Sequence, residues 1–431
     1  MVGTLPSAFH PDDHDGKINT APDGPTPDRR TGKPIDLKWG ILATGGISQS
    51  FTKDILISPK TREVQDITHH VVAAASRSKA KAQEFVDTYC KTIDAQQAGV
   101  STQAFGSYEE LVACDEVQIV YIGSPHSHHF EHAKLCLNAG KHVLCEKPLT
   151  VNAAQAEELV RLAREKKLFF MEAVWTRFFP IMYEIQARIR AGDIGDVTHV
   201  HAEFAMNASV DSLADTERLI DPKLAGGSLL DMGPYPLLHV LLAQLHPLLA
   251  SQGKQDSQEP IPLPKIAASS VFGSKKLADR VGGPIDEATT AILTWPSAHA
   301  GEGADEVETV ISTSFRREGD PQRVVQIQGT RGTISISSTP CRPTAYKLRS
   351  WASPSSMTYG ATAEHQEEHT FELPGGIHGF GFEADCCARA IRAGEIEHSR
   401  MPHRETILQM KIFDEIRGQT GLTYPESIEA V

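Results

Sequence analysis

The sequence predicts an α/β protein in which an N-terminal Rossmann dinucleotide-binding domain precedes a C-terminal α+β domain with a large open, mainly antiparallel sheet. Three observations support this prediction. Short apolar runs alternate with helix-like segments early in the chain, a Gly-rich turn follows the first run, and later segments alternate polar with apolar residues. At 431 residues the chain exceeds one ordinary core, so two domains are expected. We place them at residues 36–175 and 176–431, behind a tail of residues 1–35.

The tail and the composition argue against several classes of protein. Residues 1–35 are dense in Pro, Asp, Gly and Thr, so a disordered tail is expected, with an arm over a neighbouring subunit as the alternative. The tail lacks the apolar core of a signal peptide, and no run of about 20 apolar residues follows. With 42 basic and 55 acidic residues, the net charge of −13 disfavours nucleic acid and membrane binding. Seven cysteines without paired spacing predict reduced thiols and a cytoplasmic location.

The first domain has the pattern of a doubly wound α/β unit. Its apolar runs lack the period-two alternation of half-exposed strands, which predicts a parallel sheet with helices on both faces. Segments with helical spacing separate the runs. The expected strands lie within residues 35–42, 69–78, 117–125, 141–148 and 168–175.

The second domain has a different pattern. A helix is expected at 179–195, and two closing helices are expected at 381–399 and 404–421, the last ending at Gly421. Segments rich in Pro, Gly and charge at 249–264 and 295–306 predict surface loops. Alternation of polar and apolar residues predicts antiparallel strands at 197–207, 288–296, 308–317, 323–329 and 332–338.

The turn after the first strand is a candidate phosphate site. In a strand-turn-helix unit, glycines allow a tight turn, and the new helix offers free N–H groups and its positive dipole end to a pyrophosphate. The fingerprint G-x-G-x-x-G is present as the segment 43–48, ATGGIS, in which small residues replace its first and third glycines. A glycine pair in an ordinary loop is the alternative. The candidate cofactor residues are Thr44, Gly45, Gly46 and Ile47.

The end of the second strand indicates which nicotinamide cofactor binds. An acidic residue there would hold the ribose of NAD and repel the extra phosphate of NADP. This chain has Ser76 and Arg77 instead. Because a guanidinium can pair with a 2′-phosphate and stack on adenine, NADP is expected. Alternatively, Arg77 caps the solvent edge of the sheet and leaves cofactor preference open.

Several separated motifs resemble one enzyme family. They are SPHSHHFEHAKLCLNAG, KHVLCEKP, MEAVWTRFFP, GGSLLDMGPY and MKIFDEIRGQTGLTYP, in this order along the chain. Together they are similar to the glucose-fructose oxidoreductase-like (Gfo/Idh/MocA) family over residues 37–425, and most similar to its D-xylose and dihydrodiol dehydrogenases. The resemblance implies an oxidoreductase with a Rossmann domain and a nicotinamide cofactor.

The resemblance assigns roles at the end of the strand at 141–148. It implies that Glu146 and Lys147 lie at the cofactor, that Lys147 reaches the substrate hydroxyl and the nicotinamide ribose, and that a cis peptide bond precedes Pro148. An ammonium beside a phenol stabilises the phenolate and so makes it a better base. An isolated E-K-P segment would otherwise indicate an exposed turn.

The segment 230–235 resembles the active-site segment of the family. If these residues begin a helix, Asp231 and Tyr235 lie four apart on one face. The resemblance implies that Tyr235 is the general acid or base and that Asp231 orients the substrate or the tyrosine. A buried core aromatic with a satisfied hydroxyl is the alternative for Tyr235.

Two further segments are expected at the cofactor. Histidines at 126–132 suggest a metal site by their spacing, but family members use this loop to cover the cofactor, so no metal is expected. Trp175 resembles a pocket residue of relatives, whereas Arg177 is either part of this site or a domain-interface ion pair. The cofactor residues expected from these segments are Ser124, His126, His129, Trp175 and Arg177.

These inferences lead to one functional prediction with two alternatives. The expected activity is NADP-dependent oxidation of the C1 hydroxyl of D-xylose and similar aldoses to the lactone, with Lys147, Asp231 and Tyr235 as catalytic residues. A trans-dihydrodiol dehydrogenase on the same scaffold is the first alternative, and a non-catalytic NADPH- or sugar-sensing regulator is the second. A homodimer is expected through the exposed face of the second sheet, because such a sheet must cover its apolar surface.

Overall fold

The computed structural model describes residues 34–91, 101–298, 306–351 and 363–431. The expected tail, residues 1–35, lies outside the described residues except for its last two. No helix within the described ranges has the length and apolar character needed to cross a membrane.

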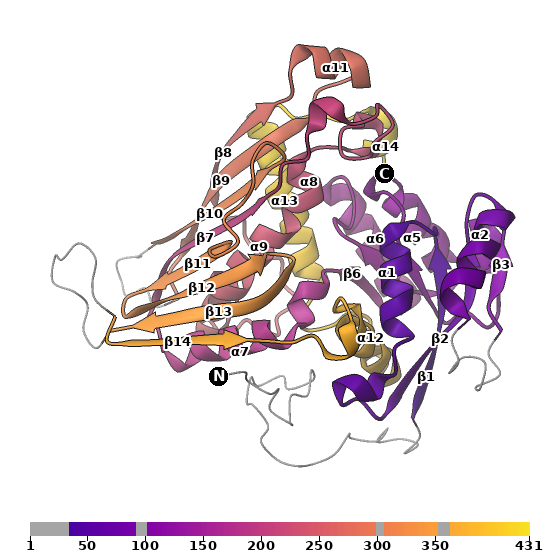
Figure 1. Cartoon of the computed structure of the whole chain (residues 1–431), viewed down its shortest axis with the longest axis horizontal. Helices are drawn as coiled ribbons and strands as arrows, with labels where there is room; N and C mark the ends of the chain where they lie inside the picture. Colours follow the sequence, from indigo (N-terminus) through magenta and orange to yellow (C-terminus); the bar gives the residue numbers. More distant parts are fainter. Residues whose placement is uncertain (1–33, 92–100, 299–305, 352–362) are drawn as a thin grey trace.

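The N-terminal sheet is parallel and has the strand order β3-β2-β1-β4-β5-β6, as the sequence predicts for a doubly wound fold. Its central strands are buried on both faces, which explains their unbroken apolar runs. Crossovers between parallel strands are right-handed, which puts α1 and α2 on one face and α4, α5 and α6 on the other. Helix α5 contacts both α4 and α6, and Figure 1 shows this domain to the right of the C-terminal sheet. The elements are β1 (Ile35–Leu42), α1 (Gly46–Ile55), β2 (Ile67–Ala75), α2 (Lys79–Phe85), β3 (Gln103–Phe105), α4 (Tyr108–Val112), β4 (Ile119–Ile122), α5 (His129–Asn138), β5 (His142–Glu146), α6 (Ala153–Lys166) and β6 (Phe170–Ala173).

The C-terminal sheet has the order β14-β13-β12-β11-β7-β10-β9-β8. Neighbouring strands are antiparallel except β7 and β10, so the expected mainly antiparallel sheet is confirmed. Three of its strands, β8, β13 and β14, were not expected from the sequence. The strands are β7 (Val197–Ala205), β8 (Lys265–Phe272), β9 (Asp286–Pro296), β10 (Glu306–Ser314), β11 (Val325–Gly329), β12 (Gly332–Thr339), β13 (Arg342–Ser350) and β14 (His365–Thr370).

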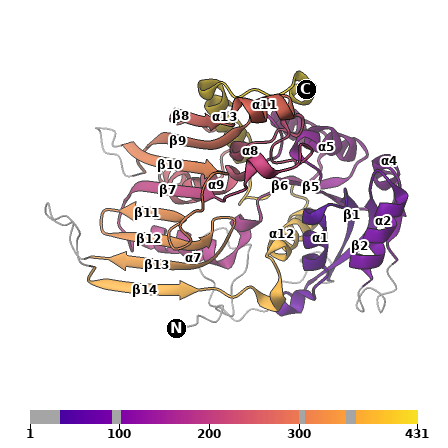
Figure 2. The same cartoon turned by 45° about the horizontal axis from the view of Figure 1, so that its top comes forward.

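Helices gather between the two sheets (Figure 2). Helices α8 and α9 pack on β7, β9 and β10, whereas α13 packs on β8 and on α6 of the N-terminal domain. The 3₁₀ helix η4 joins β6 to α7, and α12 returns to the N-terminal sheet beside α1. These elements are η4 (Trp175–Phe178), α7 (Pro180–Ala191), α8 (Ser228–Met232), α9 (Pro234–Val240), α10 (His246–Ser251), α11 (Lys275–Val281), α12 (Phe380–Ala393), α13 (His403–Thr420) and α14 (Glu426–Glu429).

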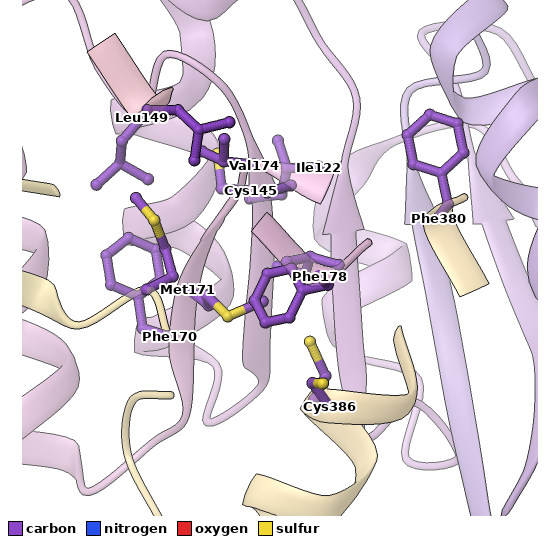
Figure 3. Close-up of a cluster of buried hydrophobic side chains, with 14 of the residues drawn as sticks. Ile122, Cys145, Leu149, Phe170, Met171, Val174, Phe178, Phe380 and Cys386 are labelled. Atoms are coloured by element: carbon purple, nitrogen blue, oxygen red, sulfur yellow. The ribbon is translucent and has the colours of Figure 1, made fainter. Parts of the chain in front are cut away.

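A buried polar link joins α12 to the N-terminal sheet. Arg62 donates two hydrogen bonds to the carboxylate of Asp385, at 2.6 and 2.7 Å, and His69 Nε2 lies 2.9 Å from the same carboxylate. Trp39 Nε1 donates to His69 Nδ1, so the proton of the imidazole is on Nε2 and points at Asp385. Apolar side chains flank this link, and Figure 3 shows those of β5, β6 and η4 gathered next to Cys386 of α12.

The free edge of β8 is covered by one side chain. Gln419 of α13 accepts a hydrogen bond from the backbone N–H of Ala268 and donates one to the carbonyl oxygen of Ile266. The amide therefore satisfies one donor and one acceptor on a strand that, within the described ranges, has no further strand beside it.

Candidate active site

The turn between β1 and α1 is open at the N-terminus of the helix. Gly45 precedes the helix without any side-chain cap, and the first turn contains no acidic residue. A Cβ atom on Gly46 would meet nothing within 4 Å. Free N–H groups facing open space suit a pyrophosphate, so this turn fits the dinucleotide cofactor that its sequence predicts.

The two missing glycines of the fingerprint have different explanations. Ala43 occupies the first position with φ of 69°, the left-handed region that glycine adopts without strain. Ser48 occupies the third position, where glycine normally lets the helix approach the sheet. The space comes instead from Gly123, which follows β4, because a Cβ atom there would lie 2.2 Å from Ser48 Oγ.

We expect Gly123→Ala to destabilise the protein by about 1–3 kcal/mol, because the new methyl group would overlap Ser48 Oγ. Denaturant unfolding of the single variant and of the Gly123→Ala, Ser48→Ala pair measures this. The pair should recover part of the loss, since the next nearest atoms to the added carbon belong to Tyr121 and Ile47, at 3.1 and 3.2 Å. Equal losses in the two variants would contradict the predicted contact.

Ser76 and Arg77 lie at the same edge of the sheet as the turn. Leu42 pairs with Ala75, so the residues after β1 and β2 emerge side by side. Ser76 is buried, whereas Arg77 is exposed. Burial raises the pKa of Tyr108, and the nearby charge of Arg77 partly opposes this rise. An exposed guanidinium beside the turn is available to a ribose phosphate.

The histidines after β4 hold the loop at 124–128 against the β5 turn. His129 is fully buried, with Nδ1 2.9 Å from the carbonyl oxygen of Pro148 and Nε2 2.8 Å from that of Ser124. Burial lowers its pKa to about 4, so the ring is neutral and donates to one of these carbonyls at a time. His126 donates to the carbonyl oxygen of Ala225, and burial lowers its pKa to about 3. These partners make the histidines structural, and no group of three or more possible metal ligands occurs within the described ranges.

Lys147, Asp231 and Tyr235 come together at the carboxyl edge of the N-terminal sheet. The peptide bond from Lys147 to Pro148 is cis, as the family resemblance implies. Lys147 Nζ donates to the backbone carbonyl of Asp231, lies 3.8 Å from its Oδ1, and lies 5.0 Å from the centre of the Tyr235 ring. Asp231 belongs to α8 and Tyr235 to α9, and helical Gly233 joins the two helices. The helix therefore begins before residue 231, but both side chains still face Lys147.

The environment of Tyr235 differs from the expected one. Burial raises the pKa of Tyr235 well above its usual value, and nearby Cys341 and Glu146 raise it further. The ammonium of Lys147 lies over the ring face and makes its hydrogen bond to Asp231, so the expected activation of the phenol by Lys147 is not seen. Tyr235 is therefore a neutral phenol at neutral pH, the form that donates a proton.

Glu146 lies behind Lys147 rather than in the open site. Its Oε1 accepts a 2.6 Å hydrogen bond from the hydroxyl of Tyr121, and its Oε2 accepts one from the backbone of Lys147. Burial raises the pKa of Glu146 against these hydrogen bonds. The carboxyl group thus fixes the backbone from which Lys147 projects.

The structure separates Trp175 from Arg177. Trp175 stacks on Phe380 at 4.2 Å, and its buried Nε1 has no hydrogen-bond partner among the described residues. This N–H lies near enough to Tyr235 to lower the pKa of the phenol slightly against its burial. Arg177 is 1% exposed and donates to Glu405 at 2.6 Å and to the carbonyl oxygen of Arg400 at 2.7 Å. The guanidinium of Arg177 is therefore enclosed by groups of residues 176–431, so its ion pair does not join the two expected domains, and the expected contact of Arg177 with the cofactor stays a prediction.

Two residues of the site were not singled out from the sequence. Arg218 Nη1 donates a hydrogen bond to Asp231 Oδ1 at 2.7 Å. Burial alone would raise the pKa of Asp231, but the positive charges of Lys147 and Arg218 outweigh it and lower the pKa to about 2. Glu172 of β6 accepts hydrogen bonds from the backbone of Leu149 and from Gln409, and so fixes the segment after the cis bond. Arg218 belongs to none of the family motifs, and Glu172 stands in MEAVWTRFFP without any sign there of its partners, because each residue acts through a contact that only the fold creates.

Glu172 predicts a pH dependence of stability. Burial raises its pKa from 4.5 to about 7, so the folded state favours the protonated carboxyl. The stabilisation from this proton is complete below pH 4.5 and is lost as the pH rises through 7. At about 1.4 kcal/mol for each pKa unit, the loss is at most about 3–4 kcal/mol. Unfolding of the wild type and Glu172→Gln between pH 4 and 8 should show curves that diverge in this window, and parallel curves would contradict the prediction.

Models of known families match both parts of the chain. Residues 37–174 match the oxidoreductase family with an NAD-binding Rossmann fold, and residues 182–335 match the GFO/IDH/MocA C-terminal domain. D-xylose 1-dehydrogenase (NADP(+)) of Hypocrea jecorina is 39% identical over 92% of this chain and 95% of its own length. Trans-1,2-dihydrobenzene-1,2-diol dehydrogenase of Bos taurus is 31% identical over 90% of this chain and 98% of its own.

Solved structures share the fold at lower identity. A levoglucosan dehydrogenase in complex with NADH and levoglucosan gives a TM-score of 0.67 at 16% identity, covering 90% of this chain and 97% of that one. A 3-ketoreductase from Actinomadura kijaniata in complex with NADP gives 0.65 at 19% identity, covering 89% and 98%. The chain therefore belongs to the Gfo/Idh/MocA family of NAD(P)-dependent oxidoreductases.

Proposed function

We propose that this protein oxidises the C1 hydroxyl of D-xylose and similar aldoses to the lactone with NADP. The observation that carries the proposal is the grouping of Lys147, Asp231 and the buried hydroxyl of Tyr235 at the carboxyl edge of the dinucleotide fold. The similarity to the D-xylose 1-dehydrogenase of Hypocrea jecorina supports the choice of substrate and cofactor.

The cofactor, when bound, accepts a hydride from the substrate carbon. The backbone of residues 44–47 would bind its pyrophosphate, and Ser76 and Arg77 would bind the 2′-phosphate of NADP. Trp175, whose buried indole N–H lies beside Tyr235, would line the nicotinamide end, and Ser124, His126 and His129 would shape the loop beside it.

Each of the three proposed catalytic residues has a separate role toward the substrate. Tyr235, after its phenol has released its own proton to solvent, takes the hydroxyl proton during oxidation, and as the neutral phenol it donates a proton in the reverse direction. Lys147 donates a hydrogen bond to the substrate oxygen and stabilises the negative charge that develops there. Asp231 orients the substrate. Because the lactone leaves without further chemistry, the reaction needs no additional acid or base.

The domain arrangement and the assembly are part of the proposal. Residues 36–175 would bind the cofactor and 176–431 the substrate, in a cytoplasmic homodimer. The helices lie on one face of the eight-stranded sheet, whereas Ile292 and Val271 of the opposite face are 39% and 54% exposed. This uncovered face supports pairing of two copies. Light scattering should give twice the chain mass at micromolar concentration, and a monomer mass would overturn the dimer.

A substrate panel tests the proposed activity. Purified protein is mixed with NADP or NAD and with D-xylose, D-glucose, L-arabinose or a trans-dihydrodiol, and nicotinamide reduction is followed. Fastest turnover of D-xylose with NADP supports the proposal, and Arg77→Ala should then raise KM for NADP more than for NAD. Preference for the dihydrodiol would instead support the activity named for the Bos taurus relative. Tight NADPH binding without turnover of any substrate would point to a sensor.

A further inference from the structure

Arg218 sits on a backbone turn that is fixed on both sides. Ile220 N–H donates to Glu217 at 3.0 Å, and Gly227 N–H donates to Leu219 at 2.9 Å. A Cβ atom on Gly226 would lie 2.9 Å from the carbonyl oxygen of Arg218, so only glycine permits this approach. The turn thus holds Arg218 in place just before α8, the helix that carries Asp231.

The guanidinium of Arg218 and the ammonium of Lys147 face the same oxygen. Arg218 Nη1 lies 2.7 Å from Asp231 Oδ1, whereas Lys147 Nζ lies 3.8 Å from it. The Asp231 side chain is 11% exposed and that of Arg218 is 49% exposed. Of the two cations, Arg218 therefore forms the direct charge-assisted hydrogen bond to the Asp231 carboxylate. Lys147 Nζ instead donates its hydrogen bond to the backbone carbonyl of Asp231.

Removing Arg218 would change this balance. With its nearer partner gone, Asp231 Oδ1 would close on Lys147 to the distance of a direct ion pair, about 2.7–2.9 Å. The ammonium would then be held by the carboxylate and drawn away from the ring of Tyr235, over which it now lies at 5.0 Å.

We propose that Arg218 is a positioning residue that holds the Asp231 carboxylate back from Lys147, and so keeps the ammonium available to the substrate oxygen and to Tyr235. This inference rests on the proposed dehydrogenase function. In this proposal Arg218 acts through Asp231, with which it makes its direct hydrogen bond, so its effect depends on the negative charge of that residue.

A double-mutant cycle tests this dependence with Arg218→Met, Arg218→Lys, Asp231→Asn and the Arg218→Met, Asp231→Asn pair. We expect Arg218→Met to lower kcat/KM about 100-fold, as for a misplaced catalytic group, and Arg218→Lys to recover at least about 10-fold of it, because lysine restores a cation for Asp231. In the Asp231→Asn background, Arg218→Met should change kcat/KM by less than about 3-fold, since the charge that would capture Lys147 is gone. An equal loss in both backgrounds would overturn the proposal.

Arg280 provides a matched control. It binds the same loop from the outside through hydrogen bonds to the carbonyl oxygens of Val210 and Asp211 and an ion pair with Asp215. Arg280→Met should leave kcat/KM unchanged, and a loss like that of Arg218→Met would mean that loosening the loop is the cause and would overturn the proposal.

A crystal structure of Arg218→Met separates this inference from the proposed function, because it needs no turnover. A direct contact between Lys147 Nζ and an Asp231 carboxylate oxygen is expected. If the distance stays near the present 3.8 Å, the inference is wrong whatever the substrate. If the contact forms but the wild type oxidises none of the sugars or diols, the proposed function is wrong instead.

Discussion

Tyr235→Phe is expected to lower kcat/KM for aldose oxidation by about 10²- to 10⁴-fold, the range that a general acid or base contributes. The variant loses only the hydroxyl and keeps the ring that packs near Phe204 and under Lys147. Binding of NADPH, followed by fluorescence titration, should change little, because the phenol does not contribute to the phosphate sites. Tyr346→Phe is the matched control, since it loses a hydroxyl bonded to Glu184, outside the proposed catalytic group.

The pH profile makes this prediction more specific. Burial raises the pKa of Tyr235, so the phenol is ready to donate a proton in the reductive direction but must lose one for oxidation. The rate of oxidation in the wild type should therefore rise with pH through the neutral and alkaline range, and the residual rate of Tyr235→Phe should not follow this rise. Full activity in the variant, or an unchanged profile, would assign the base to another residue.

Asp385→Ala is expected to destabilise the protein by about 3–5 kcal/mol, because it leaves the buried cation of Arg62 without its partner. The side chains of Arg62 and Asp385 are 0% and 2% exposed. Burial would raise the pKa of Asp385, but Arg62 and then His69 outweigh it and hold the pKa at about 2. Urea unfolding at neutral pH measures the loss of stability.

The double variant Arg62→Met, Asp385→Leu tests the origin of that loss. Apolar side chains of similar volume bury no charge, so the pair should unfold at a higher urea concentration than Asp385→Ala. Asp385 also joins α12 to the N-terminal domain through Arg62 and through His69 of β2, so the single variant should loosen this contact before the sheets themselves unfold. If the double variant loses as much stability as its two single variants together, side-chain volume rather than charge determines the stability at this site.

The fold was predictable where burial imposes a pattern on the sequence. The strands of the parallel sheet are enclosed by helices, so their apolar runs are unbroken and were recognised. β3 has only three residues, and β8 and β14 lie at sheet edges where few side chains are buried, so their sequences lack such a pattern. The ion-pair partner of Arg177, Glu405, lies 228 residues away, and no local spacing distinguishes that arrangement from a cofactor contact.

The candidate site was predictable only as far as its motifs reach. Lys147, Asp231 and Tyr235 stand in segments with a recognisable order, and the structure brings them together. Arg218 stands in a loop whose sequence does not indicate that it faces Asp231. The protonation state of Tyr235 could not be predicted from the sequence either. The pKa of a phenol depends on its burial and on the position of a nearby ammonium, and both are properties of the folded chain.

Gln419 has a consequence for how copies of this protein can associate. Its amide takes the place that the backbone of an added strand would occupy on β8, while β14 at the far end is short and carries charged residues. Among the described residues, both ends of the sheet are therefore poor templates for another chain. This disfavours growth into open-ended fibrils through the sheet edges, whereas the dimer proposed above, through the broad face, would close after one partner. We expect Gln419→Ala to form higher oligomers on prolonged incubation.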